Sequence, residues 1–504
     1  MKNHAENQRI GSFIQSLREA RGMTQEDFAK ALKTSQSAVA RMETGHQNMT
    51  TELLGKVSAV LGHKIVSLNN TMDFEIHGGK KLSGSVKINY SKNGSVGLLC
   101  ASLLNKGKTT LHGIAEIEEV KRVIEILESI GVKVTWIKKN SLEIIPPKVF
   151  DMTHLNKASA IKTRSIVMFI GPLIHHLKSF SIPHAQGCSL GMRSIAAHKY
   201  GIETLGAKIK VTQQDYVITS GKLKPATIIM YEAGDTPAEN ILMAAALIDG
   251  ITTIKFTSSN YMVQEMCFFL ETCGVKIDGI GTSTLTVHGI KEINKNIEYH
   301  NSEDPIEAMM FITAAIATDS KLTLTHCPID FLELELNKLQ KMGLKYKITK
   351  KYVSENKHTK LVDIIIFPSK LKALEDKIHA NPYPAINADN LPFFAIPAIK
   401  AKGQTLIHDW LYENRAIYLT ELNRMGANLT LADQHRLYIE GGTEFKPAQI
   451  VCPPALRPSV VIMIAMLGAS GTSILRNVYM INRGYEEIAE RLNSIGADIK
   501  VISS

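Results

Sequence analysis

A unit of helix, glycine and strand recurs six times after about residue 72 and constrains the fold more than any other feature. In each copy a helix-like segment ends in a glycine and runs into an alternating strand, as in ILESIGVKV and LNSIGADIKV. The closing glycines lie 75, 68, 69, 83 and 70 residues apart: Gly131, Gly206, Gly274, Gly343, Gly426 and Gly496. Glycine suits a helix C-terminal cap because it adopts a left-handed backbone without strain. The spacing therefore predicts six α/β units of about 70 residues each.

A second helix precedes each closing segment and is apolar almost all round, as in AENILMAAALIDG and SVVIMIAMLGASG. Such helices are expected to be buried. Short alternating stretches such as TTLHG, TTIKF and KLTLTH follow most of them and are predicted to be strands. Six units with buried helices favour two lobes of three units, with a ligand site between them. One continuous array is the alternative, and the stretch to 83 residues in one interval argues against it.

Residues 1–68 differ from the repeats and are predicted to be a separate domain of four or five short helices. IGSFIQSLREARG has apolar residues at helical spacing. The next helix begins at Thr24, which with Asp27 resembles a capping box, and a third starts at Ser35. Two short helices joined by a tight turn form a helix-turn-helix, whose second helix enters the major groove of DNA.

Length and composition limit the number of domains and the class of protein that this chain can be. A chain of 504 residues suggests about three domains, and 44% hydrophobic with 21% charged residues is typical of a soluble globular protein. The sequence has no secretory signal and no apolar run of membrane-spanning length, so we expect a cytoplasmic protein with no membrane association. None of the six cysteines forms a C-x-x-C pair, so no metal site is expected and most thiols should be free and packed. The net charge of +10 favours anionic partners.

The N-terminal segments T-Q-E-D-F-A and S-Q-S-A-V-A-R-M-E-T-G resemble the Cro/repressor-like helix-turn-helix family. The resemblance implies binding of double-stranded DNA through residues 9–68. Its candidate contacts are Gln25, Ser35, Gln36, Ser37 and Arg41. Gln36 can bond adenine edges and Arg41 can reach a base or a phosphate. A helical protein–protein module without DNA contact is the alternative. Because such domains usually bind as dimers, a homodimer is expected.

The repeats resemble the enolpyruvyl transferases. The likeness rests on Lys92-Asn93 and on the segments A-E-N-I-L-M-A-A-A, Y-E-N-R, E-L-N-R-M-G-A, A-L-R-P-S and R-G-Y-E-E-I. It is nearer to the UDP-N-acetylglucosamine 1-carboxyvinyltransferases of peptidoglycan and cell wall synthesis than to the shikimate enzymes. The implied fold is a two-lobed inside-out α/β barrel, with helices inside and sheets outside. The implied lobes are residues 72–90 with 299–504, and residues 91–298.

The resemblance implies transfer of the enolpyruvyl group of phosphoenolpyruvate to a hydroxyl of UDP-N-acetylglucosamine or a related nucleotide or sugar acceptor, with release of phosphate. No cofactor is required. Lys92 would hold phosphoenolpyruvate, Cys188 on the loop AQGCSLGMRS would be a proton donor, and Asp389 would be the base toward the attacking hydroxyl. The implied substrate-binding residues are Asn93, Arg164, Arg193, Asp304, Arg415, Arg457 and Arg483. Arginine pairs bidentately with carboxylate and phosphate. A lone arginine or lysine is nevertheless usually a solvated charge, and a lone aspartate often a helix cap.

Several positions depart from the family pattern on the acceptor side. Ala196 and Ala455 stand where the family has aspartates, Ala197 replaces a leucine and Met168 a tryptophan. Glu232 and Asp235 stand in the family's diphosphate loop, where negative charge is unfavourable. The loop before Cys188 is two residues longer. These departures favour a changed acceptor. They also leave open a second class of protein, a transcription regulator whose degenerate transferase domain senses a ligand.

Overall fold

The computed structural model of the chain describes residues 10–12, 14–19, 21, 23–47, 49–61, 72–185 and 194–503. These residues form two compact units that divide between Thr71 and Met72. The smaller unit consists of helices and the larger one holds the strands.

The smaller unit packs its helices around one apolar cluster. A helical stretch within residues 10–19 precedes α2 (Gln25–Leu32), α3 (Gln36–Glu43) and α4 (Thr51–Leu61). Phe28, Val39 and Met42 are fully buried in this cluster. The predicted capping box is confirmed, because Thr24 and Asp27 each accept a backbone hydrogen bond from the other. The short connection between α2 and α3 produces the helix-turn-helix arrangement.

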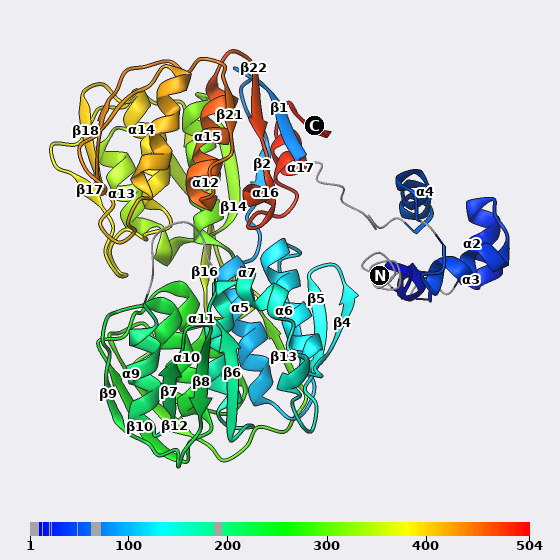
Figure 1. Cartoon of the computed structure of the whole chain (residues 1–504). Coiled ribbons are helices and arrows are strands. Elements are labelled where there is room, and N and C mark those ends of the chain that lie inside the picture. Colours follow the sequence, from blue (N-terminus) through cyan, green and yellow to red (C-terminus); the bar gives the residue numbers. More distant parts are fainter. Residues whose placement is uncertain are drawn as a thin grey trace. The chain divides into compact units, whose positions relative to one another are not determined.

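The larger unit contains two lobes (Figure 1), and each lobe has three separate sheets in the described residues. The sheets of the first lobe are β21 (Gln449–Val451)-β22 (Gly471–Arg476)-β1 (Met72–Gly78)-β23 (Ile499–Ser503), β15 (Lys345–Val353)-β16 (Lys360–Phe367)-β14 (Leu322–Pro328)-β2 (Ser85–Lys87), and β17 (Ile378–His379)-β18 (Gln404–His408)-β20 (Arg436–Glu440)-β19 (Asn428–Leu431). The sheets of the second lobe are β13 (Ile297–His300)-β3 (Thr109–His112)-β5 (Ser141–Ile145)-β4 (Lys133–Lys138), β11 (Lys276–Asp278)-β12 (Thr284–Gly289)-β10 (Gly250–Lys255)-β9 (Thr227–Ile229), and β6 (Ser179–Pro183)-β8 (Asp215–Thr219)-β7 (Lys208–Val211). The second lobe thus extends to His300.

The apolar helices lie inside each lobe, as predicted. In the first lobe α12 (Pro305–Ala317), α14 (Ala395–Lys400) and α15 (Leu456–Gly468) pack against one another. In the second lobe α5 (Lys92–Ala101), α8 (Ile170–Leu173) and α10 (Asp235–Ala246) fill the same role. The other helices of the larger unit are α6 (Glu118–Ser129), α7 (Lys157–Lys162), α9 (Ala196–Thr204), α11 (Tyr261–Thr272), α13 (Glu333–Lys341), α16 (Tyr479–Asn482) and α17 (Ile488–Asn493), and α11 packs against α5 and α10.

All six closing glycines have positive φ, between 84° and 109°, so the predicted left-handed caps are confirmed. Two predicted inner helices instead begin as 3₁₀ turns: η3 (Arg164–Phe169) before α8 and η5 (Leu391–Phe394) before α14. Pro172 and Pro397 explain the difference. Proline lacks the N–H that an α-helix donates four residues back, and this breaks a continuous α-helical pattern.

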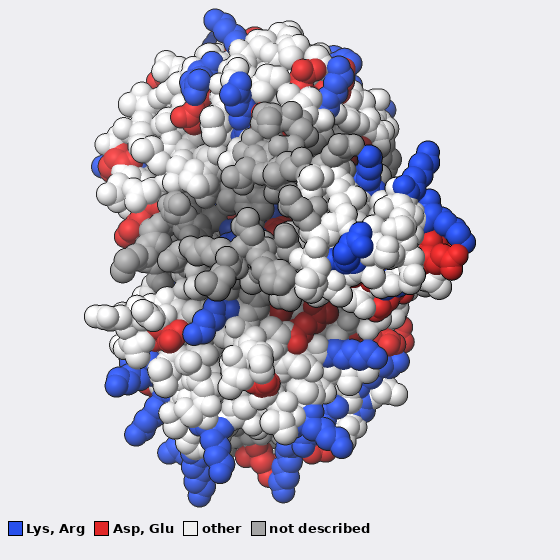
Figure 2. All heavy atoms as spheres, turned by 45° about the vertical axis from the view of Figure 1, so that its right-hand side comes forward, with Lys and Arg blue, Asp and Glu red and all other residues white. Residues whose placement is uncertain are grey.

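None of the helices in the described residues is long and apolar enough to cross a membrane. Five cysteines are free and buried, as expected for packed thiols. On the face of the larger unit seen in Figure 2, Lys and Arg side chains are spread over both lobes together with Asp and Glu.

Candidate active site

Two antiparallel chain segments connect the lobes. The Ser91 amide donates to the Ser302 carbonyl at 2.7 Å, and the Asp304 amide donates to the Asn89 carbonyl at 2.8 Å. The side-chain amide of Asn301 donates to the Ser91 carbonyl at 2.8 Å. A Cβ at Gly94 would lie 2.4 Å from the Asn301 oxygen, so this close approach requires glycine. The crossing places Lys92 at the first turn of α5, facing both lobes.

Asp304 occupies the N-cap of α12, where Oδ1 accepts from the Ile306 amide at 2.8 Å. Its Oδ2 accepts from the backbone amide of Lys92 at 3.4 Å. Burial raises the pKa of Asp304, and the charge of Arg457 opposes this shift. Asp304 therefore links the N-termini of α5 and α12 and fixes the backbone of Lys92.

Glu119, in the first turn of α6, lies between two cations from different lobes. Lys92 Nζ is 3.6 Å from Glu119 Oε2, and Nη2 of Arg483 is 3.0 Å from the same oxygen. Thr163 and Ser165 donate to Oε1. Burial alone raises the pKa of Glu119, but the charges of Lys92 and Arg483 outweigh it and lower the pKa to about 2. The two cations are therefore held close together by one carboxylate.

Arg457 and Asp389 form a second charge pair in the same region. Arg457 Nη2 donates to Asp389 Oδ2 at 2.8 Å, and Nη1 donates to the Tyr485 hydroxyl at 2.7 Å. Arg457 is only 6% exposed. Burial raises the pKa of Asp389, whereas Arg457, Arg415 and Lys92 lower it further, to about 2. Asp389 is thus ionised at neutral pH, and its charge is within range of both Arg457 and Lys92.

Arg415 is 2% exposed and forms a bidentate ion pair with Asp409, at 2.5 and 2.8 Å. Its Nη2 also donates to the Ala388 carbonyl at 2.8 Å, and its guanidinium lies over the Tyr412 ring. The sequence predicted Arg415 to bind substrate. In this geometry it fixes the backbone immediately before Asp389, and its contact with substrate stays a prediction.

The remaining predicted residues lie around these two charge clusters, except for two that lie outside the residues described by the structure. Asn93 donates to the Tyr261 hydroxyl at 2.9 Å and accepts from Lys92 Nζ at 3.3 Å. Arg164 begins η3 and donates to the Ser194 carbonyl at 3.4 Å. Cys188 and Arg193 lie outside the described residues. A pocket beside the clusters is lined by Tyr90, Lys92, Ala115, Ile117, Asp304, Gly484, Tyr485 and Glu486, among others.

Several positions that depart from the family pattern are buried or half-buried. Met168, Ala197 and Ala455 are buried, so their side chains pack in the core. Asp235 begins α10 and is half-buried, and its carboxylate accepts from the Ser258 hydroxyl at 2.5 Å and from Asn260 Nδ2 at 3.1 Å. Burial raises the pKa of Asp235, and the charge of Asp389 raises it further. Asp235 therefore ties the starts of α10 and α11 together, close enough to Asp389 for the two charges to repel.

In the smaller unit, the predicted DNA-contacting residues gather at the start of α3. Ser35, Gln36, Ser37 and Arg41 are exposed. Ser35 caps the helix, and Gln36 Nε2 donates to Gln25 Oε1 at 3.3 Å. These four polar side chains are thus accessible at α3, and Gln25 reaches Gln36 from α2.

Sequence reasoning missed Glu119, Tyr485 and Asp409. Glu119 follows another glutamate in the first turn of a helix, where acidic residues are ordinary. Tyr485 lies inside R-G-Y-E-E-I, a segment in which only the arginine was predicted to be functional. Asp409 carried no signal, because its partner Arg415 is six residues away across a turn.

Solved structures share this fold. The enolpyruvyl transferase NikO from Streptomyces tendae aligns with a TM-score of 0.74 at 21% identity, over 86% of this chain and 100% of its own. The EPSP synthase from Acinetobacter baumannii aligns at 0.67 with 20% identity and the same coverage. The large unit therefore has the two-lobed fold of enolpyruvyl transferases, which confirms the predicted fold class.

Sequence comparison defines the family. The model of EPSP synthase (3-phosphoshikimate 1-carboxyvinyltransferase) matches residues 76–492, and a helix-turn-helix model matches residues 14–66. A UDP-N-acetylglucosamine 1-carboxyvinyltransferase of Campylobacter jejuni is 32% identical over 427 residues, which is 84% of this chain and 98% of that protein. The chain belongs to the EPSP synthase family of enolpyruvyl transferases and carries an N-terminal helix-turn-helix domain.

Proposed function

We propose that the chain transfers the enolpyruvyl group of phosphoenolpyruvate to a hydroxyl of UDP-N-acetylglucosamine or a related nucleotide or sugar acceptor, with release of phosphate. The observation that carries the proposal is the gathering of Lys92, Arg457 and Arg483 where the two lobes meet, around Glu119 and Asp389. Phosphoenolpyruvate carries a phosphate and a carboxylate, and preorganised cations are the groups that stabilise both.

In the proposed reaction, C3 of phosphoenolpyruvate takes a proton and the acceptor oxygen forms a bond to C2. The acceptor hydroxyl gives its proton to a base. The C2–O bond to phosphate then breaks, C3 loses a proton, and the alkene of the product re-forms as phosphate leaves. A general acid and a general base are therefore needed, and neither a metal nor an organic cofactor is. Cys188 is the proposed acid.

Asp389 is the proposed base. With its pKa at about 2 beside Arg457, it is ionised at neutral pH but only weakly basic. When Arg457 turns toward an anionic substrate, the carboxylate loses its nearest cation and its pKa rises. Substrate binding would thus make Asp389 basic at the time when the acceptor hydroxyl needs a base.

The curated relatives at 32% identity support UDP-N-acetylglucosamine as the acceptor and a role in peptidoglycan synthesis. The acceptor side of the site supports a related molecule instead. The family's two aspartates are absent at Ala196 and Ala455, and Asp235 places a half-buried carboxyl near Asp389. We therefore propose an acceptor that makes fewer hydrogen bonds to carboxylates than UDP-N-acetylglucosamine does.

We also propose that the helix-turn-helix domain binds double-stranded DNA as a homodimer. Support comes from the exposed polar side chains of α3, with Gln36 in its first turn and Arg41 in its last. These are the side-chain types that read adenine and guanine edges or contact phosphate.

Phosphate release from phosphoenolpyruvate, measured with UDP-N-acetylglucosamine and with other nucleotide sugars, tests the transferase proposal. We expect release with at least one acceptor and a fall in kcat of about 10²–10⁴-fold in Asp389→Asn. Asp433→Asn is the matched control, because Asp433 also pairs with an arginine, Arg436, but on an exposed turn. No release with any acceptor, together with binding of phosphoenolpyruvate, would instead support the ligand-sensing regulator.

A further inference from the structure

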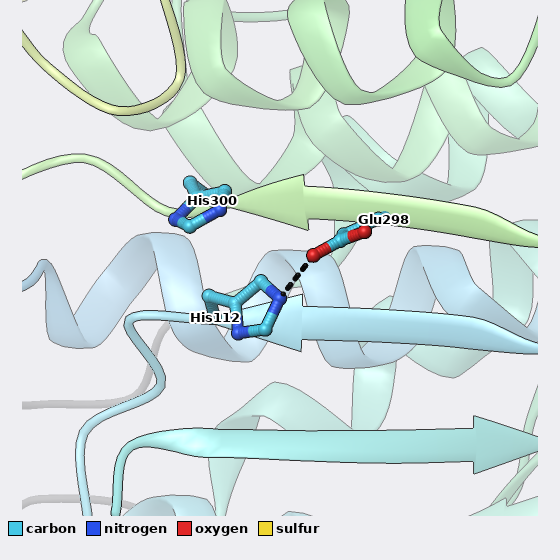
Figure 3. Close-up of side chains that lie close together, drawn as sticks. All are labelled: His112, Glu298 and His300. Carbon is cyan, nitrogen blue, oxygen red and sulfur yellow. Dashed lines mark hydrogen bonds and ion pairs between the residues drawn. The ribbon is translucent and has the colours of Figure 1, made fainter.

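Two histidines and a glutamate meet at one end of the sheet formed by β13, β3, β5 and β4, apart from the charge clusters described above. The parallel register of β13 and β3 places His300 directly beside His112. Glu298 lies two residues before His300, so its side chain points to the same face of the sheet. Figure 3 shows the three side chains converging across the two strands.

The distances suit a metal ion. His112 Nε2 lies 2.8 Å from Glu298 Oε1, and the rings of His112 and His300 are 4.4 Å apart. One ligand atom from each of the three residues lies within 4.8 Å of the others. A tetrahedral zinc ion with bonds of about 2.0–2.1 Å places its ligands about 3.3 Å apart. Glu298 is exposed and His300 is half-buried, so binding an ion at that spacing would require their side chains to rotate toward His112.

His112 is already oriented by its neighbours. It is buried, and its Nδ1 lies 2.9 Å from the hydroxyl of Ser141 on β5. A hydroxyl can donate to Nδ1 or accept from it, so either tautomer of the ring is satisfied. When Nδ1 carries the proton, Nε2 has a free lone pair on the side that faces Glu298. A ligating histidine is usually held in this way by a second-shell partner.

We propose that His112, His300 and Glu298 bind a divalent transition-metal ion, with zinc as the physiological candidate. Two imidazoles and one carboxylate favour zinc over magnesium or calcium, which prefer oxygen ligands alone. Three protein ligands leave the fourth position for water. The charge of Glu355 near His300 favours a bound cation, and the charge of Lys138 opposes it. This proposal does not depend on the transferase activity.

The place of the site gives the ion a structural role. His300 is the last residue of β13, and the next residue, Asn301, donates its amide to the His112 carbonyl at 2.9 Å. Residues 301–304 then cross to the first lobe. An ion at this point would link β3 to the strand that leads into the crossing, and would strengthen the sheet where the chain leaves it.

Zinc titration of the metal-stripped full-length chain, followed by calorimetry, tests the proposal. We expect one more equivalent of zinc to bind to the natural chain than to His300→Asn, and binding at this site to weaken at least about 10-fold in Glu298→Gln. Zinc should also raise the Tm of the natural chain more than that of either variant. Magnesium at the same concentration should leave both results unchanged.

His288→Asn is the matched control. His288 is also a strand histidine paired with a carboxylate, Asp278, at 2.7 Å, but no second histidine joins the pair among the described residues. The His288→Asn variant should bind zinc with the same stoichiometry and affinity as the natural chain. Circular dichroism establishes that each variant is folded. Equal zinc stoichiometry and affinity in the natural chain and in folded His300→Asn would overturn the proposal.

Discussion

Glu119 offsets the positive charges of the side chains where the lobes meet. It is the carboxylate shared by Lys92 and Arg483, which come from different lobes. An anionic substrate that binds the two cations must compete with this carboxylate. The free protein thus carries its own counter-ion, which keeps two cations together that would otherwise repel.

Glu119→Gln should destabilise the folded chain by about 3 kcal/mol at neutral pH, the scale for breaking a buried ion pair. Because the pKa of Glu119 is lowered to about 2, its stabilisation is present above about 4.5 and is lost as the pH falls from there toward 2. The difference in Tm between the natural chain and the variant should therefore be large at pH 7 and shrink below pH 4.5.

Glu118→Gln provides the control for this pH series. Glu118 is the adjacent residue and also pairs with an arginine, Arg122, but one turn along the same helix and with more of its side chain exposed. Its loss should change stability by a few tenths of a kcal/mol. A Tm difference for Glu119→Gln that stays constant from pH 7 to pH 3 would contradict the assignment.

The sequence alone predicted few of the individual site residues and contacts. Lys92, Asp389, Arg457 and Arg483 come from four distant segments, and no spacing rule relates them, so only the family resemblance selected them. Side-chain partners such as Glu119 could not be predicted, since they depend on how the two lobes meet.

Among the elements, the hairpin β15–β16 forms a second bridge between the lobes. Its turn brings Asn356 to Glu265 on α11, with Asn356 Nδ2 donating to Oε2 at 3.0 Å. The His358 ring stacks on Phe268, also on α11, with centroids 4.1 Å apart. A hairpin of the first lobe is thus anchored on a helix of the second.

Glu265 makes this anchor sensitive to pH. Burial raises its pKa to about 7, although hydrogen bonds from Ser302, Tyr299 and Asn356 oppose the shift. The stabilisation from the neutral carboxyl is complete below about 4.5 and is lost as the pH rises through 7. We expect Glu265→Gln to remove this loss, so the Tm of the variant relative to the natural chain should rise between pH 5 and pH 8. A parallel pair of Tm curves over that range would contradict the prediction.

The elements themselves were largely predictable. Closing glycines such as Gly131 and Gly496 marked the ends of helices because their left-handed backbone is a local requirement. Apolar helices such as α12 were identified as buried because no polar face was available. The 3₁₀ turns before α8 and α14 were not predicted, and neither was the meeting of His112 with His300, because strand register depends on pairing across the sheet.

At the scale of the whole molecule, the chain combines an enolpyruvyl transferase unit with a helix-turn-helix unit. The proposed DNA contact lies on α3, whereas the proposed chemistry lies between the lobes of the other unit. Changes on α3 should therefore leave catalysis intact.

The double variant Gln36→Ala, Arg41→Ala should weaken DNA binding by about 10-fold or more in a mobility shift, since each lost base contact costs about 1–3 kcal/mol. Phosphate release should be unchanged. Lys30→Ala is the control, because Lys30 is exposed on α2 and pairs with Glu26. Binding of the natural chain should also fall steeply with salt. An equal loss in Lys30→Ala would point to non-specific attraction rather than to contacts from α3.

The paired crossing of the lobes has a consequence for engineering. Tyr90 and Glu303 face each other in an antiparallel bridge, so the segment that forms the second lobe begins and ends at neighbouring points. Segments with adjacent ends tolerate circular permutation and transplantation, because closing them requires only a short linker. We therefore expect that a few residues are enough to join the two ends of the second lobe, and that this lobe can be exchanged for that of a relative.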